Sequence, residues 1–209
     1  MAKKTKSSKI WLREHLTDPF VKRAKAEGYR SRASFKIKEI LERDALIRPG
    51  AFVADLGATP GGWSQVLAEH VGAKGRVIAL DLLPMKPLSG VEFVQGDFTD
   101  DRIFDQLLQL TVGRKLDLVF SDIAPNLSGE MEVDQARQMY LAELALDFAE
   151  KTLVMGGSFL VKVFEGEGMK EYRQRLKQVF KEISVRKPAA SRARSREFYL
   201  LAKYFSATP

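Results

Sequence analysis

A short apolar run turns into a glycine loop in Val53-Ala54-Asp55-Leu56-Gly57-Ala58-Thr59-Pro60-Gly61-Gly62-Trp63, and this stretch determines how the fold is interpreted. The run before the glycines is typical of a buried strand, and an amphipathic stretch follows over 62–71. Glycines at such a turn permit positive φ and let the backbone approach a ligand closely. We therefore predict a strand, a tight turn at a binding site and a helix. The glycine loop alone is weak evidence, because many α/β proteins turn in the same way.

The alternation of short apolar runs with longer amphipathic stretches continues to the end of the chain. The expected strands are 51–56, 76–81, 91–94, 116–121, 158–164, 182–187 and 197–204, and the expected helices are 62–71, 100–110, 133–153 and 168–180. Strands separated by helices indicate parallel βαβ units, whereas the last two strands are joined by a loop alone and should pair antiparallel. Upstream, apolar residues at helical spacing over 10–48 predict two or three helices with basic faces. The pattern predicts an α/β fold with a ligand crevice at the carboxyl ends of its strands.

Acidic residues mark the ends of the first four predicted strands, at Asp55, Asp81, Asp97 and Asp122. Asp81 comes 20 residues after Gly61, where a carboxylate can accept hydrogen bonds from both ribose hydroxyls. Four carboxylates around one crevice favour a ligand with a ribose and a positive charge and would repel a pyrophosphate. S-adenosylmethionine therefore fits better than NAD or ATP, whose motifs G-x-G-x-x-G and G-x-x-x-x-G-K-[ST] are absent. Taken singly, each aspartate could equally be a turn residue or a helix cap.

Composition limits the remaining choices. The chain has 209 residues, 45% of them hydrophobic, which is enough for one sizeable core and short for two ordinary domains. Its net charge of +7 is concentrated at the N-terminus, because residues 1–36 hold eleven Lys and Arg against three acids and the rest holds 23 against 24. A basic segment on a near-neutral body suggests a polyanionic partner, although a solvated tail would have the same composition.

Several classes of protein are excluded by what the sequence lacks. There is no cysteine, so disulfide scaffolds, thiolate zinc sites and cysteine nucleophiles are ruled out. The two histidines, His15 and His70, do not have the spacing of a metal pair, and no metal is expected. No apolar run approaches the roughly 18 residues that span a membrane, and no apolar segment follows the basic start as in a signal peptide. We expect a cytoplasmic protein without membrane contact.

Four polar residues are candidates for chemistry. Lys162 lies inside an apolar strand, which is costly unless the amine is paired or opens into a site. Lys36 precedes the sheet and Glu197 begins its last strand, so with Asp122 they could form a Lys-Asp-Lys-Glu cluster. Sequence spacing alone does not bring them together, and solvent-facing charges are the alternative for Lys36 and Glu197. Trp63 is also open to two interpretations, a core residue or a cofactor contact.

A series of motifs covers the chain from about residue 10 almost to its end. They are Ser31-Arg32-Ala33-x-Phe35-Lys36, Asp55-Leu56-Gly57-Ala58-x-Pro60-Gly61-Gly62-Trp63-Ser64-Gln65, Asp81-Leu82-Leu83-Pro84-Met85, Gln95-Gly96-Asp97-Phe98, Asp122-x-Ala124-Pro125-Asn126-x-Ser128-Gly129, Gly156-Gly157-Ser158-Phe159, Val161-Lys162-Val163-Phe164-x-Gly166-Glu167-Gly168 and Arg186-Lys187-Pro188-x-x-Ser191-Arg192-Ala193-Arg194-Ser195-Arg196-Glu197. In these motifs the chain resembles the bacterial FtsJ/RrmJ (RlmE) family of ribosomal RNA ribose 2′-O-methyltransferases.

The resemblance implies a Rossmann-like class I methyltransferase fold that uses S-adenosylmethionine. It implies a seven-stranded, mostly parallel sheet with one antiparallel strand at the edge, and helices on both faces. The implied reaction is 2′-O-methylation of a uridine in the peptidyl-transferase region of 23S rRNA, within the large (50S) ribosomal subunit. The family's catalytic tetrad falls on Lys36, Asp122, Lys162 and Glu197, and its cofactor contacts fall on Gly61, Trp63, Asp81, Asp97 and Asp122. Thr59 and Lys38 depart from the family pattern, in which Ala and an acid are usual, but neither change removes a functional group.

We expect residues 1–30 to form a basic, partly disordered arm and residues 31–209 a single methyltransferase domain that acts as a monomer. The arm and three arginines would hold RNA phosphates, at Arg192, Arg194 and Arg196. Aromatic candidates for stacking on a flipped base are Tyr29, Phe35 and Tyr199, with ordinary core packing as the alternative, above all for Phe35.

Two versions of the chemistry stay open at this point. Lys162 either accepts the proton of the 2′-hydroxyl or stays charged and stabilises the developing alkoxide. The alternatives for the whole protein are a related enzyme acting on tRNA or an mRNA cap, and an RNA-binding ribosome-assembly factor. An NAD-dependent oxidoreductase is disfavoured by the glycine pattern.

Overall fold

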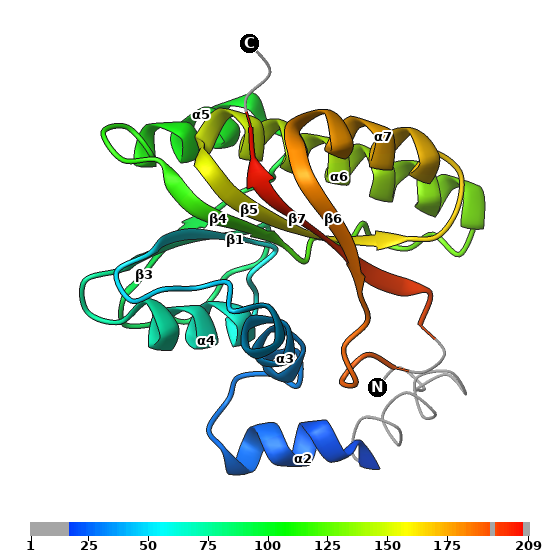
Figure 1. Cartoon of the computed structure of the whole chain (residues 1–209). Coiled ribbons are helices and arrows are strands. Elements are labelled where there is room, and N and C mark those ends of the chain that lie inside the picture. Colours follow the sequence, from blue (N-terminus) through cyan, green and yellow to red (C-terminus); the bar gives the residue numbers. More distant parts are fainter. Residues whose placement is uncertain (1–16, 193–194, 207–209) are drawn as a thin grey trace.

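Seven strands form one sheet at the centre of the molecule (Figure 1). The computed structural model describes residues 17–192 and 195–206. The strands are β1 (Phe52–Leu56), β2 (Arg76–Asp81), β3 (Val91–Gln95), β4 (Leu116–Ser121), β5 (Leu153–Phe164), β6 (Phe180–Arg186) and β7 (Glu197–Phe205), in the spatial order β3-β2-β1-β4-β5-β7-β6. The strand order reverses between β1 and β4, which is the topological switch point where open α/β sheets bind ligands.

The sheet is parallel from β3 to β5, whereas β7 is antiparallel to both of its neighbours, β5 and β6. The predicted antiparallel pairing of the last two strands is therefore confirmed. The prediction that the antiparallel strand lies at the edge is wrong, because β7 inserts between β5 and β6 and leaves β6 outermost. The physical reason is burial: β7 is apolar on both faces and mostly buried, while β6 carries exposed charges such as Lys181 and Glu182 that protect an open edge.

The described part of the chain has six helices: α2 (Pro19–Ala26), α3 (Ser34–Asp44), α4 (Gly62–Val71), α5 (Asp101–Leu110), α6 (Met131–Thr152) and α7 (Met169–Val179). Helices α5, α6 and α7 cover one face and α3 and α4 the other (Figure 1). Along β1, Phe52, Ala54 and Leu56 join the core under α5–α7, and Val53 joins the core under α3 and α4, as the two-residue period of a strand requires. Across residues 17–192 and 195–206, none of the helices has the length and apolar character needed to cross a bilayer.

The described part of the predicted arm packs on the body of the protein. Asp18 caps α2 by accepting hydrogen bonds from the backbone N–H groups of Phe20 and Val21. Ala24 of α2 is buried in a small cluster with Phe35 and Ala190. The prediction for residues 1–16 of the arm falls outside the described residues.

Candidate active site

A cavity of about 520 Å³ opens at the carboxyl ends of the parallel strands. Each of the first four strands contributes part of its wall through the loop that follows it, and α6 closes one side. The lining residues are Gly57, Thr59, Leu80, Asp81, Leu82, Leu83, Gly96, Asp97, Phe98, Thr99, Asp122, Ile123, Ala124, Pro125, Asn126, Arg137, Tyr140 and Leu141. The predicted crevice therefore exists, and it lies at the switch point between β1 and β4.

Three of the predicted carboxylates, those of Asp81, Asp97 and Asp122, converge on this cavity. The Asp81 carboxylate is fixed by the backbone, because one oxygen accepts a hydrogen bond from the N–H of Thr59 and the other from the N–H of Leu83, both at 2.8 Å. Each oxygen keeps a lone pair for a ligand hydroxyl. The wall of the cavity thus offers a pre-oriented acceptor pair with two further carboxylates nearby.

The prediction that Asp55 also faces the crevice is wrong. Its side chain is fully buried, and Oδ2 accepts a hydrogen bond of 2.6 Å from the Ser64 hydroxyl on α4. Within the described residues its Oδ1 has no hydrogen-bond partner. Burial, helped by the negative charges of Asp122 and Asp81 and opposed by the Ser64 hydrogen bond, raises the pKa of Asp55 to about 7. Asp55 is inside β1 rather than at its end, so the strand points its side chain toward α4.

The four residues of the predicted tetrad come together through Tyr199 in one series of contacts, which we call the catalytic chain after the role that the family resemblance implies for them. Lys162 Nζ donates to the Asp122 backbone oxygen at 2.6 Å and lies 3.0 Å from Asp122 Oδ1. The Tyr199 hydroxyl donates to the same Oδ1 at 2.9 Å and accepts from Lys36 Nζ at 3.3 Å. Lys36 Nζ also lies 2.5 Å from Glu197 Oε1. Asp122 is the member that also lines the cavity, so it joins the two parts of the site.

Of the two interpretations left open for Tyr199, base stacking and core packing, the structure supports core packing. Its ring is fully buried beside Trp63, with ring centroids 5.5 Å apart, so it is not free to stack on a base. Burial raises its pKa well above the ordinary value, and the charges of Asp122 and Glu197 raise it further. The hydroxyl therefore stays protonated and donates to Asp122. The signal was present, because Tyr199 follows Glu197 by two residues on one strand and so points to the same side of the sheet.

Gly61 and Trp63 are not among the described residues that line the cavity. Trp63 is 3% exposed, and its Nε1 donates to the Ala33 backbone oxygen at 2.9 Å. A Cβ at Gly61 would lie 2.8 Å from Arg30 Nη1 and 2.9 Å from Met85 Sδ. Trp63 therefore contacts the segment before α3. Gly61 lies so close to Arg30 and Met85 that a larger side chain would not fit at this position.

The remaining predicted RNA contacts have different surroundings. Phe35 is buried, whereas Tyr29 is half-buried with its hydroxyl 3.2 Å from Glu69 Oε2. Arg196 is exposed, and its Nη2 donates to the Glu165 backbone oxygen at 3.0 Å. Arg194 lies outside the described residues, and Arg192 is half-buried. Over the part of the chain that the structure describes, no group of three or more His, Asp or Glu side chains is placed to hold a metal ion.

A switch-point cavity lined by carboxylates, adjoining a partly buried Lys-Asp-Lys-Glu set, fits a Rossmann-like methyltransferase. The profile of the FtsJ-like methyltransferases matches residues 29–205, and the chain belongs to this family.

Relatives and solved structures agree with this assignment. Ribosomal RNA large subunit methyltransferase E from Azoarcus sp. (strain BH72) is 58% identical over 95% of this chain and 97% of its own length. The protein of the same name from Alkalilimnicola ehrlichii is 59% identical over 97% of both chains. A crystal structure described as a ribosomal RNA methyltransferase from Plasmodium falciparum superimposes with a TM-score of 0.76 at 28% identity, covering 86% of this chain and all of that one. The fold expected from the sequence is confirmed by these likenesses.

Proposed function

We propose that this chain transfers a methyl group from S-adenosylmethionine to the 2′-hydroxyl of a uridine in 23S rRNA. The observation that carries the proposal is the double role of Asp122, which lines the cavity and also accepts the hydrogen bonds of Lys162 and Tyr199. A ligand in the cavity would therefore meet the catalytic chain at Asp122. The names of the relatives support rRNA of the large subunit as the substrate.

The cavity fits the proposed cofactor in size and charge. Its volume of about 520 Å³ is within the usual range for a ligand of this size. The two oxygens of Asp81 are held by backbone N–H groups and offer acceptors for two ribose hydroxyls, while Asp97 and Asp122 add negative charge suited to a cation. When bound, S-adenosylmethionine supplies a methyl group that is already activated by its positively charged sulfur.

The main contribution of the protein is therefore alignment. Holding the ribose oxygen in line with the methyl group can remove about 7–11 kcal/mol of the barrier. Lys162, which would hold this oxygen, comes from β5, whereas Lys36 and Glu197, which support the site, come from α3 and β7. The hydrogen bonds that link these residues through Asp122 and Tyr199 fix the geometry before substrate arrives.

The geometry at Lys162 favours the version in which its amine stays charged. Lys162 Nζ donates to the Asp122 backbone oxygen at 2.6 Å and lies 3.0 Å from the carboxylate oxygen Oδ1, whose negative charge favours an ammonium with three N–H donors. The third donor is left for the ribose oxygen, which it would hold and stabilise as negative charge develops. The hydroxyl becomes strongly acidic only as the new C–O bond forms, so the nearby Asp122 carboxylate can accept the proton at that stage. We propose this division of roles, with Tyr199 and Lys36 holding Asp122 and Glu197 in place.

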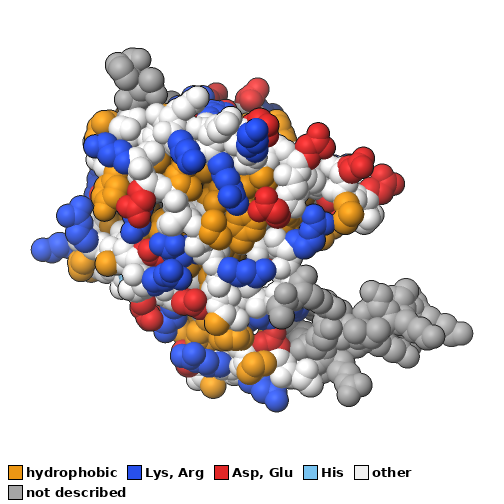
Figure 2. Space-filling model, turned by 45° about the vertical axis from the view of Figure 1, so that its right-hand side comes forward, with side chains coloured by type: hydrophobic (Ala, Val, Ile, Leu, Met, Phe, Trp, Pro, Cys, Tyr) orange, Lys and Arg blue, Asp and Glu red, His pale blue; other side chains and the backbone are white. Residues whose placement is uncertain are grey.

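Surface charge supports a nucleic-acid substrate. Lys and Arg side chains lie over the face shown in Figure 2 together with Asp, Glu and apolar side chains, and the whole chain has a net charge of +7. Basic side chains that neutralise phosphates make binding weaken steeply as salt is added. We further propose that the protein acts in the cytoplasm as a monomer on assembled large subunits.

The decisive experiment uses labelled S-adenosylmethionine and large subunits from cells that lack this methylation. We expect the label on one uridine ribose of 23S rRNA, located by mapping the 2′-O-methyl mark. Label in tRNA or at an mRNA cap would show that the same reaction acts on a different RNA. Absence of label in every RNA, with retained binding to the subunit, would favour a ribosome-assembly factor.

A further inference from the structure

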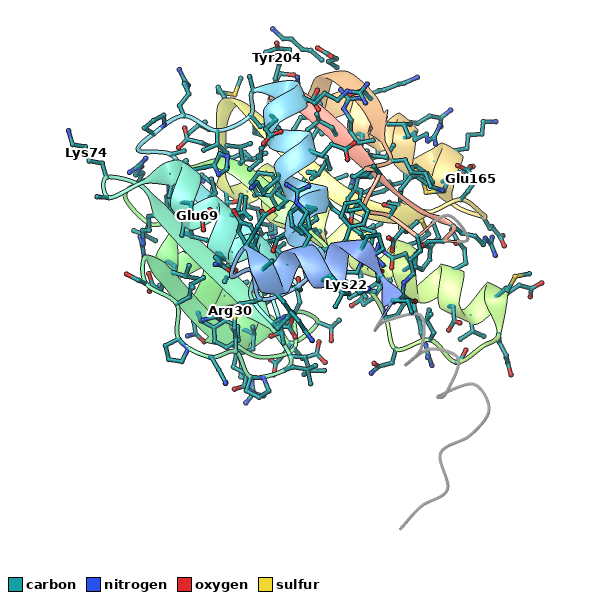
Figure 3. The ribbon with its side chains drawn as sticks, turned by 90° about the horizontal axis from the view of Figure 1, so that it is seen from below. Lys22, Arg30, Glu69, Lys74, Glu165 and Tyr204 are labelled. Atoms are coloured by element: carbon teal, nitrogen blue, oxygen red, sulfur yellow. The ribbon has the colours of Figure 1, made fainter. Side chains whose placement is uncertain are left out.

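Arg30 connects two loops that border the cavity (Figure 3). Its Nη1 donates to the backbone oxygens of Pro60, at 3.3 Å, and Lys86, at 2.7 Å. Its Nη2 donates to the backbone oxygen of Pro87 at 2.7 Å. One guanidinium therefore cross-links the glycine loop after β1 to the loop after β2, and both its terminal nitrogens are used.

Both of these loops form the wall of the cavity. The glycine loop contributes Gly57 and Thr59, and the loop after β2 contributes Leu82 and Leu83. Inside the cavity the same two loops meet again, because the Thr59 hydroxyl donates to the Leu83 backbone oxygen at 3.1 Å. Arg30 and Thr59 therefore hold the same two loops together at different points.

Arg30 belongs to a segment that is joined to the start of α4 at several points, and we call residues 28–34 the bridging segment. The Arg30 N–H donates to Gln65 Oε1 at 3.2 Å, and Gln65 Nε2 donates to the Gly28 oxygen at 3.1 Å. The Ser34 hydroxyl donates to the Gly62 oxygen at 2.9 Å. A Cβ at Gly62 would lie 2.2 Å from Ser31 Oγ, so the segment packs directly on the glycines.

The chemistry of the three acceptors explains why an arginine suits this position. Among the described residues Arg30 forms no ion pair with a carboxylate, and its partners are neutral backbone oxygens on separate loops. A planar guanidinium presents several donors in a fixed fork, whereas a lysine offers one nitrogen that reaches a single point. The fork fixes the distance between the loops as well as supplying hydrogen bonds.

We propose that Arg30 is a positioning residue for the cofactor: its guanidinium holds the glycine loop and the loop after β2 at the separation that the bound nucleoside requires. The inference rests on the proposed function, because it assumes that the cavity binds S-adenosylmethionine. It also makes the N-terminal bridging segment part of the cofactor site. Arg30 acts through the loops and touches no reacting atom.

The test measures S-adenosylmethionine binding to the full chain by calorimetry, with no RNA and no methyl transfer required. Arg30→Ala should weaken the affinity about ten-fold, since hydrogen bonds from a charged donor are worth roughly that much or more. Arg30→Lys keeps the charge but loses the fork, and should weaken it to a similar extent. Arg114→Ala is the matched control, because Arg114 also donates to a loop oxygen, that of Gly50, at the opposite end of the strands.

Two further readouts separate positioning from a general loss of stability. Arg30→Ala should raise KM for the cofactor while kcat at saturating cofactor stays within about two-fold, and thermal unfolding without ligand should match that of Arg114→Ala. Wild-type affinity in Arg30→Ala or in Arg30→Lys overturns the inference. If the wild-type chain itself does not bind S-adenosylmethionine, the proposed function fails, and that result is distinct because it precedes any substitution.

Discussion

The cofactor cavity and the catalytic chain are built in different ways. The cavity wall comes from the loops after β1, β2, β3 and β4, which are neighbours in the parallel part of the sheet, and from α6 on one side. The catalytic chain joins Lys36 of α3, Asp122 after β4, Lys162 of β5, and Glu197 and Tyr199 of β7. It depends on the insertion of β7 beside β5, where Lys162 and Tyr199 are paired in register. Under the proposed function, cofactor binding would therefore be a property of the parallel half of the sheet, and methyl transfer would depend on the antiparallel part.

This contrast has a direct consequence, because Asp122 is the residue that the two regions share. A substitution in the cavity wall should change cofactor affinity and leave turnover at saturation nearly intact. A substitution in the catalytic chain beyond Asp122 should change turnover and leave cofactor affinity intact. The substitutions below test this division.

Lys162→Ala should have the largest effect. It removes the donor that we place on the ribose oxygen, and loss of such a group costs about 10²–10⁴-fold in rate. We expect kcat to fall about 10³-fold while calorimetry gives an unchanged affinity for S-adenosylmethionine. Lys115→Ala is the control, because this exposed lysine donates to the Lys151 backbone oxygen at the opposite end of β4 from Asp122. Full activity in Lys162→Ala would refute its assigned role.

Asp55→Asn should change the pH dependence of stability. The pKa of about 7 in the folded protein lies above the value of about 4 expected in the unfolded chain. Between these values the folded protein holds a proton that the unfolded chain releases, so the contribution of Asp55 to stability falls as pH rises and is lowest above pH 7. Asparagine carries no charge, so the variant should exceed the wild type by up to about 4 kcal/mol at pH 8 and match it near pH 4.

Urea unfolding between pH 4 and pH 8 measures the free energy of unfolding of the wild type and of Asp55→Asn. Asp105→Asn, at an exposed position, is the control. A difference between wild type and Asp55→Asn that stays constant with pH would show that Asp55 is ionised throughout. A difference that grows as predicted would show that a neutral acid lies behind the cavity wall. Asp55 then belongs to the scaffold of the cavity, distinct from Asp81 in its wall.

Most of the parallel half could be predicted from the sequence because its signals are local. Strand ends are readable from apolar runs, and the carboxyl ends of parallel strands meet at one edge, which predicts the convergence of Asp81, Asp97 and Asp122. The sequence did not show which way Asp55 points, because its position one residue before the strand end reverses the side of the sheet that it faces. It also did not show that Gly61 packs against Arg30, a partner 31 positions earlier in the chain.

The catalytic chain could not be derived from local patterns. Lys36 and Glu197 are 161 positions apart, and nothing in the spacing indicates that α3 and β7 bring them within 2.5 Å. Family resemblance supplied these residues, while the buried position of Tyr199 became visible only once β7 was found inside the sheet. Long-range pairing of strands sets such contacts, and a strand pattern does not specify its neighbours.

Asp81→Asn tests the cavity wall. The amide keeps one acceptor oxygen but replaces the other with a donor, so one ribose hydroxyl loses its partner and the Thr59 or Leu83 N–H faces a like donor. We expect the affinity for S-adenosylmethionine to fall about 10- to 100-fold, with kcat at saturation changed little. Asp105→Asn on the exposed face of α5 serves again as control. A large fall in kcat with unchanged affinity would contradict the division between the two regions.

Tyr199→Phe should have the smallest effect and gives the sharpest test of the catalytic chain. The variant keeps the buried ring and its contact with Trp63 but removes the hydroxyl that donates to Asp122 and accepts from Lys36. We expect kcat to fall about ten-fold with unchanged cofactor affinity, as for supporting groups that orient a reactive one. Tyr172→Phe is a matched control, since it removes a buried hydroxyl bonded to the Ala142 oxygen, away from the site. If both variants lose only stability, Tyr199 is a packing residue and its hydroxyl has no role in turnover. If Tyr199→Phe alone loses turnover, the hydroxyl orients Asp122 relative to Lys36.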